Sequence, residues 1–136
     1  MTSSLTVRPE FPKNGILWHE WNDDTIRMIE ERDRPVLLFV ANPDPIIAPF
    51  LKGVLRAMSL NEKLRDLLHH YYIALMVYSD SMPEYFEDLD AGSRYNIAIL
   101  SPAGLTPMVT IDPMDGRPEE IVGTILNVLE KLQEVY

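Results

Sequence analysis

Two adjacent histidines, His69 and His70, are the residues in this sequence whose type is best suited to chemistry. Imidazole is a common metal ligand and acid–base catalyst. Adjacent residues on a helix do not share a face, so the pair cannot hold one ion between its rings. No third ligand of a suitable type lies near them, as a zinc site would require. The sequence therefore indicates no metal site and no bound cofactor.

Carboxylates are the second group of residues that could do chemistry. Asp44 precedes a predicted helix start, and Asp80, Glu84 and Glu87 follow a predicted strand. Such spacing is typical of solvated faces, and neither a Ser, His and Asp set nor a Gly-rich phosphate loop accompanies them. Asp44 is interpreted as a helix N-cap. The sequence indicates no catalytic residue, and an enzyme of unrecognised non-thiol chemistry stays open as an alternative.

The element expected to position Asp44 is a strand over residues 36–41, VLLFVA. A short, continuous apolar run is typical of a central strand that is covered on both faces. Residues 42–44 are predicted to form a loop, and a helix is predicted to open near Pro45. Pro49 lies in or just past its first turn, where a missing N–H does little damage. A second buried strand is predicted over residues 72–78.

The remaining elements alternate around these two strands. Residues 96–100 and 108–111 are predicted to form a hairpin, because Pro and Gly join two short apolar runs. Further helices are predicted over residues 23–32, 61–70, 79–92 and 118–135. The predicted fold class is α/β, with a central mixed sheet of about four strands flanked by helices. In this sheet the strands 36–41 and 72–78 are parallel neighbours, and the hairpin lies at one edge.

A charged residue and Pro, an apolar strand, a loop of about four residues and a helix together resemble the thioredoxin-fold superfamily. The nearest resemblance is to thioredoxin-like domains with Trp-x-x-Trp upstream, a set that includes the DUF255 family. Here that pair is Trp18 and Trp21. The resemblance covers about residues 16–132 and implies a thioredoxin-like fold with both Trp rings in the core. His19, between them, is expected to face solvent or to act as a cap.

The resemblance also identifies a chemistry that this chain lacks. Those families carry Cys-x-x-Cys at the loop-to-helix junction, where this sequence has Pro45-Ile-Ile-Ala48. Thiol exchange needs an attacking thiolate and a resolving thiol, which Pro45 and Ala48 cannot supply. The family's cis-Pro position is occupied by Tyr95. A cis bond before a residue other than Pro costs about 3 kcal/mol, so the Arg94–Tyr95 bond is expected to be trans.

The function favoured by these features is that of a non-catalytic binding, chaperone or assembly module. A protein partner or a second copy of the chain is the expected ligand. The residues between the family's cysteines are exposed, and an exposed apolar pair such as Ile46 and Ile47 usually marks a contact surface. The candidate binding surface consists of Asp44, Pro45, Ile46, Ile47, Ala48 and Tyr95.

Length, charge and composition bear on the number of domains, the kind of partner and the location of the protein. A length of 136 residues predicts one domain, here residues 16–136 after an N-terminal arm of residues 1–15. The net charge of -9 argues against a nucleic-acid partner, because phosphate binding depends on clustered Lys and Arg. There is no cysteine, and no apolar run has the length of a signal peptide or a membrane span. A cytoplasmic protein with no membrane partner is expected.

Overall fold

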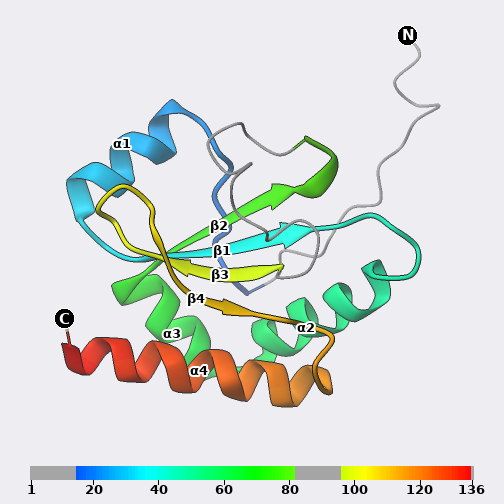
Figure 1. Cartoon of the computed structure of the whole chain (residues 1–136). Coiled ribbons are helices and arrows are strands. Elements are labelled where there is room, and N and C mark those ends of the chain that lie inside the picture. The colour runs from blue at the N-terminus through cyan, green and yellow to red at the C-terminus, as the bar shows by residue number, and fades with distance from the viewer. Residues whose placement is uncertain (1–14, 82–95, 136) are drawn as a thin grey trace, which may run out of the picture.

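The computed structural model in Figure 1 describes residues 15–81 and 96–135. Its elements in chain order are α1 (Asp23–Arg32), β1 (Val36–Ala41), α2 (Ala48–Leu60), α3 (Glu62–Tyr71), β2 (Ile73–Tyr78), a short 3₁₀ turn η2 (Ser79–Ser81), β3 (Ile97–Leu100), β4 (Pro107–Ile111) and α4 (Pro118–Val135). Each strand lies within one residue of its predicted bounds. The helix predicted over residues 79–92 falls largely outside the described residues, as does most of the predicted N-terminal arm.

The four strands form one mixed sheet in the order β2-β1-β3-β4. β1 pairs with β2 in parallel, with Val36 opposite Ile73, and pairs with β3 in the antiparallel sense. β3 and β4 form the antiparallel hairpin at the edge of the sheet. The predicted mixed sheet, with its parallel central pair, is therefore confirmed.

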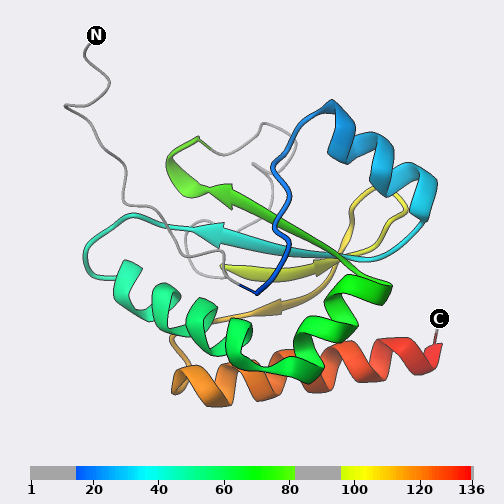
Figure 2. The same ribbon diagram turned by 180° about the vertical axis from the view of Figure 1, so that it is seen from behind.

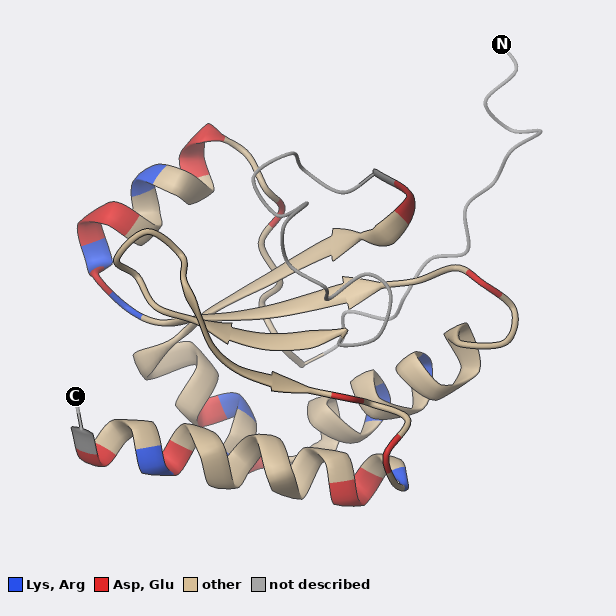
Figure 3. Cartoon of the chain, in the orientation of Figure 1, with Lys and Arg blue, Asp and Glu red and all other residues tan. Residues whose placement is uncertain are grey.

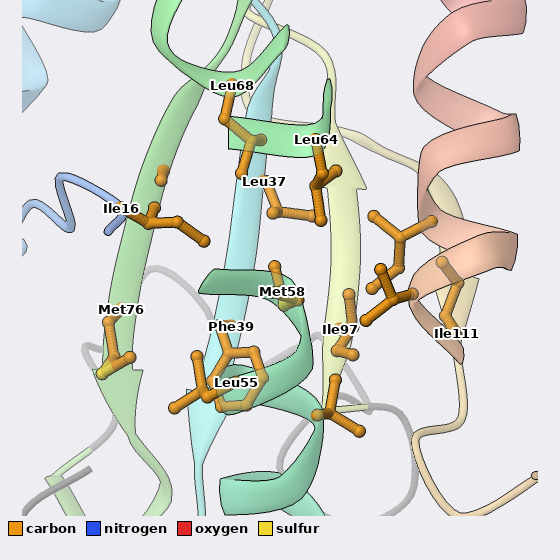
Figure 4. Packing of buried hydrophobic residues seen from close by; sticks show 14 of the residues in the cluster. Ile16, Leu37, Phe39, Leu55, Met58, Leu64, Leu68, Met76, Ile97 and Ile111 are labelled. Atoms are coloured by element: carbon orange, nitrogen blue, oxygen red, sulfur yellow. The ribbon is translucent and has the colours of Figure 1, made fainter. Parts of the chain in front are cut away.

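Helices cover both faces of this sheet, as the two opposite views show (Figures 1 and 2). α2, α3 and α4 lie on one face, and α1 lies on the other. Successive side chains of a strand point to opposite faces. Phe39 accordingly belongs to the larger core cluster under α2–α4 (Figure 4), whereas Leu38 belongs to a second cluster with Ile29 of α1. Both faces of β1 are buried, and this explains its continuous apolar sequence.

Residues 16–20 extend the sheet beyond β2 by a single parallel bridge. The His19 amide donates to the Ala74 carbonyl at 2.8 Å, and the Met76 amide donates to the His19 carbonyl at 3.0 Å. Trp18 is buried and meets Phe39 edge-on, with ring centroids 5.8 Å apart. Trp21 is half-buried against the second cluster. Both Trp rings thus pack on the core as predicted, but on opposite faces.

The sequence predicts that His19 faces solvent or acts as a cap, and the structure leaves it only partly exposed at the edge of the sheet. Its backbone pairs with the exposed edge of β2, and its side chain is half-buried as a result. The pKa of His19 is lowered, first by burial of the ring and second by the positive charge of Arg32. The folded protein therefore favours the neutral imidazole.

This lowered pKa predicts that acid destabilises the protein through His19. The contribution of neutral His19 to the free energy of unfolding is fully present above the unfolded-state pKa of about 6.5. It is lost as pH falls toward the lower folded-state pKa. The free energy of unfolding, measured by urea denaturation between pH 7.5 and 5, should fall less steeply in His19→Gln than in the wild type. His70→Gln, at an exposed histidine, is the matched control. The same pH slope in His19→Gln and wild type would contradict the prediction.

Candidate functional site

The candidate site is the junction between β1 and α2, residues 42–47, on the right of Figure 1. Side chains within the loop hold its backbone. The Asp44 amide donates to Asn42 Oδ1 at 2.9 Å, and the Ile46 amide donates to Asp44 Oδ1 at 2.8 Å. Pro43 and Pro45 fix two further backbone angles. The junction is therefore stiff. Asp44 accepts a bond within the turn that precedes α2, but the N-cap position of α2 itself is Ile47, which makes no side-chain cap bond.

The regular helix begins at Ala48, which is three residues later than the predicted start near Pro45. The turn before it is already helix-like, because the Asp44 carbonyl accepts from the amides of Ile47 at 3.0 Å and Ala48 at 2.8 Å. The next bond of the series would run from residue 49 to the carbonyl of Pro45. Pro49 has no N–H to make it, so the uninterrupted ladder starts only after this position.

The predicted exposed pair, Ile46 and Ile47, is separated by the structure. The Ile46 side chain is 74% exposed, whereas Ile47 is half-buried and packs against the larger core cluster. Successive residues of a helical turn point about 100° apart, so one faces the core when its neighbour faces solvent. Ala48 is buried, and Pro45 and Asp44 are exposed.

Ile46 nevertheless has an exposed apolar neighbour one helical turn further on. Phe50 is 47% exposed, and residues i and i+4 of a helix lie on the same face. We call Ile46 and Phe50 the apolar corner. The sequence did not single out Phe50 for the site, because it lies within a broad apolar set in which the exposed face of α2 cannot be distinguished from the buried one.

Tyr95 lies outside the described residues, but its neighbour Asn96 is described and buried. Asn96 Nδ2 donates to the Val40 carbonyl at 3.0 Å, and the Asn96 carbonyl accepts from the Val40 amide at 2.7 Å. These bonds fix the start of β3 beside the last residues of β1. The sequence signal for this role was a single amide side chain in front of an apolar strand, a position where Asn is otherwise disfavoured.

A second segment with exposed charge lies next to α2. A Cβ added at Gly53 would come within 3.2 Å of Pro118 Cγ, so α2 packs closely on the first residue of α4. Acidic residues are concentrated in this part of the chain (Figure 3), namely Asp112, Asp115, Glu119 and Glu120. The only nearby cation in this segment, Arg117, is 3.8 Å from Glu120. This acidic segment packs beside α2, which itself carries Lys52 and Arg56, so the charge around α2 is mixed.

The described residues offer little for catalysis at this junction. The sequence contains no cysteine, and residues 15–81 and 96–135 contain no group of three or more His, Cys, Asp or Glu that could hold a metal ion. Asp44, the carboxylate of the loop, is engaged by the Ile46 amide. Within the same described ranges, no helix combines the length and the apolar character needed to cross a membrane.

Comparison with protein-family models gives no match, and comparison with curated protein sequences gives none either. Solved structures do match. One is a structure entitled DsbH oxidoreductase, which aligns with a TM-score of 0.54 and 12% sequence identity over 91% of this chain and 90% of that chain. The fold is therefore thioredoxin-like, as predicted, while the finer resemblance to the DUF255 family has no support from a family model. Fold and site together define a cysteine-free protein of thioredoxin-like fold.

Proposed function

We propose that this protein is a non-catalytic binding module, of the chaperone or assembly type, that contacts another protein through the apolar corner. One observation carries the proposal. At the junction where thioredoxin-like oxidoreductases carry their thiols, this chain has none and instead presents Ile46 with 74% of its side chain exposed. Large exposed apolar side chains grouped on one surface are typical of contact surfaces.

The stiffness of the junction supports the same function. Binding costs free energy when a flexible loop must be ordered. Here the two loop hydrogen bonds and the two prolines have already restricted the backbone that carries Ile46. Complete burial of a side chain such as Ile46 contributes about 1.5–3 kcal/mol. A preordered apolar corner therefore helps to hold a modest interface.

Charge favours a different protein over a second copy of this chain. In a two-fold dimer the same surface meets itself, so two chains that each carry a net charge of -9 would approach one another. Like charges brought together at an interface oppose association. A partner of net positive charge would instead complement the net charge of -9. The proposed partner therefore has an apolar anchor and a net positive charge.

The proposal predicts that Ile46→Asp abolishes partner binding without changing stability. Leu60→Asp is the matched control, because Leu60 is 76% exposed and is the last residue of α2, the helix that follows Ile46. Tagged wild type and both variants should be compared by quantitative pull-down from the native host and by thermal unfolding. We expect partner loss in Ile46→Asp alone, with little change in melting temperature in either variant.

Two further outcomes would change this assignment. Retention of the same proteins by Ile46→Asp and wild type would contradict a contact at the corner. Sedimentation that shows a wild-type dimer converted to monomer by Ile46→Asp would assign the corner to a second copy of the chain. Ile47→Asp should lower the melting temperature instead, since Ile47 packs on the core.

A further inference from the structure

A pocket of about 210 Å³ lies between α1 and the connection from β3 to β4. Both ribbon views place these two segments side by side, α1 in blue to cyan and the connection in yellow (Figures 1 and 2). The pocket shares no residue with the apolar corner and does not depend on the proposed function. It is lined by Trp21, Ile26, Ile29, Glu30, Pro102, Gly104 and Leu105.

One wall of the pocket is held in a strained conformation. Leu105 has a φ of 53°, in the left-handed region that a bulky side chain rarely adopts. The Ser101 amide donates a hydrogen bond to the Thr106 carbonyl at 2.8 Å, and this bond closes the turn that contains Leu105. Leu105 also packs half-buried against the second core cluster. Strain of this kind persists only where surrounding contacts fix it, and it is concentrated at ligand-binding sites. The wall is therefore preformed.

The lining is apolar apart from one carboxylate. Trp21 contributes an aromatic ring, and Glu30 is the only charged residue among the lining residues. Within the described part of the chain, Glu30 belongs to none of the ion pairs, and Arg27 on the same helix is 3.7 Å from Asp24. An aromatic ring and an unpaired carboxylate beside an apolar pocket are the groups that recognise an organic cation.

We propose that this pocket binds a small organic ammonium ion, composed of a single aromatic ring on a short chain that ends in a primary amine. The apolar residues and Trp21 would receive the ring, and Glu30 would accept a charge-assisted hydrogen bond from the ammonium group. The volume limits the ligand, because pockets for drug-sized molecules measure about 300–1,000 Å³. An anionic ligand would be repelled by Glu30, and a neutral donor such as a hydroxyl would make a weaker hydrogen bond to it than an ammonium group.

The test is a titration of the intact protein with 2-phenylethylammonium, followed by the indole N–H resonance of Trp21 in ¹H–¹⁵N spectra. We expect a saturable shift in the wild type and about fivefold weaker binding in Glu30→Gln, as for the loss of one exposed ion pair at the upper end of the usual range. Glu31→Gln is the matched control, since it removes the same charge from the adjacent residue, which is exposed like Glu30 but does not line the pocket. Its affinity should stay within about twofold of wild type, because a solvent-exposed charge outside the pocket is screened.

Three results would overturn the proposal. Absence of a Trp21 shift at millimolar amine would show that the pocket does not bind it. Equal affinity for the neutral analogue 2-phenylethanol, or equal losses in Glu30→Gln and Glu31→Gln, would show that Glu30 does not select a cation. Tighter binding of N-acetyl-lysine amide than of 2-phenylethylammonium would assign the pocket to a lysine side chain of a protein.

Discussion

Replacing Phe39 by Ala is expected to lower the free energy of unfolding by about 3–5 kcal/mol, the usual cost of removing a fully buried Phe ring. Phe39 is completely buried in the middle of β1, the central strand. Its ring meets Trp18 and belongs to the cluster between the sheet and α2–α4 (Figure 4). A single domain is stable by only about 5–15 kcal/mol, so the variant should lose a large share of its stability.

Phe50→Ala is the control for this prediction, because it makes the same chemical change at a side chain that is 47% exposed. Its cost should stay below about 1.5 kcal/mol, since much of the ring is already in contact with water. Urea denaturation of the two variants and the wild type at pH 7.5 compares them directly. Equal losses for Phe39→Ala and Phe50→Ala would mean that β1 does not form the centre of the core.

The elements that the sequence predicted well are those determined by local chemistry. Asn22 and Asn61 cap α1 and α3, and each accepts a bond from the amide three residues later, at 2.9 Å in both cases. Such caps depend on a few neighbouring residues. The sequence of β1 likewise reports its environment, because a strand covered on both faces needs apolar residues at every position.

The features that the sequence could not predict depend on contacts between distant segments. Whether Ile46 or Ile47 faces the core is decided by where α2 packs, and the run of apolar residues around them does not report this. His19 is half-buried because residues 16–20 pair with β2, about 55 positions further along the chain. The Gly104-Leu105 sequence indicates a turn, but the left-handed conformation of Leu105 follows from its packing near α1.

Introducing Pro45→Cys together with Ala48→Cys is expected to create a dithiol that can form a disulfide, in a chain that otherwise has no thiol. The two positions flank the first turn before α2, and position 48 is buried, as suits a resolving thiol. The variant should nevertheless exchange disulfides slowly. A thiol at a helix start becomes a reactive thiolate when unsatisfied amides and nearby positive charge stabilise it.

Those amides are already occupied in this protein. Asp44 accepts from Ile46 through its carboxylate, and from Ile47 and Ala48 through its carbonyl. Its negative charge also lies next to position 45. The pKa of a thiol at position 45 should therefore stay near the ordinary value of about 8.5, where little thiolate exists at pH 7.

Adding Asp44→Ala to the double variant tests this cause. The change frees the Ile46 amide and removes the carboxylate, so it should lower the thiol pKa and speed disulfide exchange at pH 7. Thiolate absorbance against pH measures the pKa, and insulin reduction measures the exchange. A thiol pKa well below 7 in the double variant, with Asp44 intact, would contradict the role given to Asp44. Reduction of insulin at the rate of a thioredoxin by the same variant would show that the junction retains a working substrate groove, and the proposal of a non-catalytic binding surface would then lose its basis.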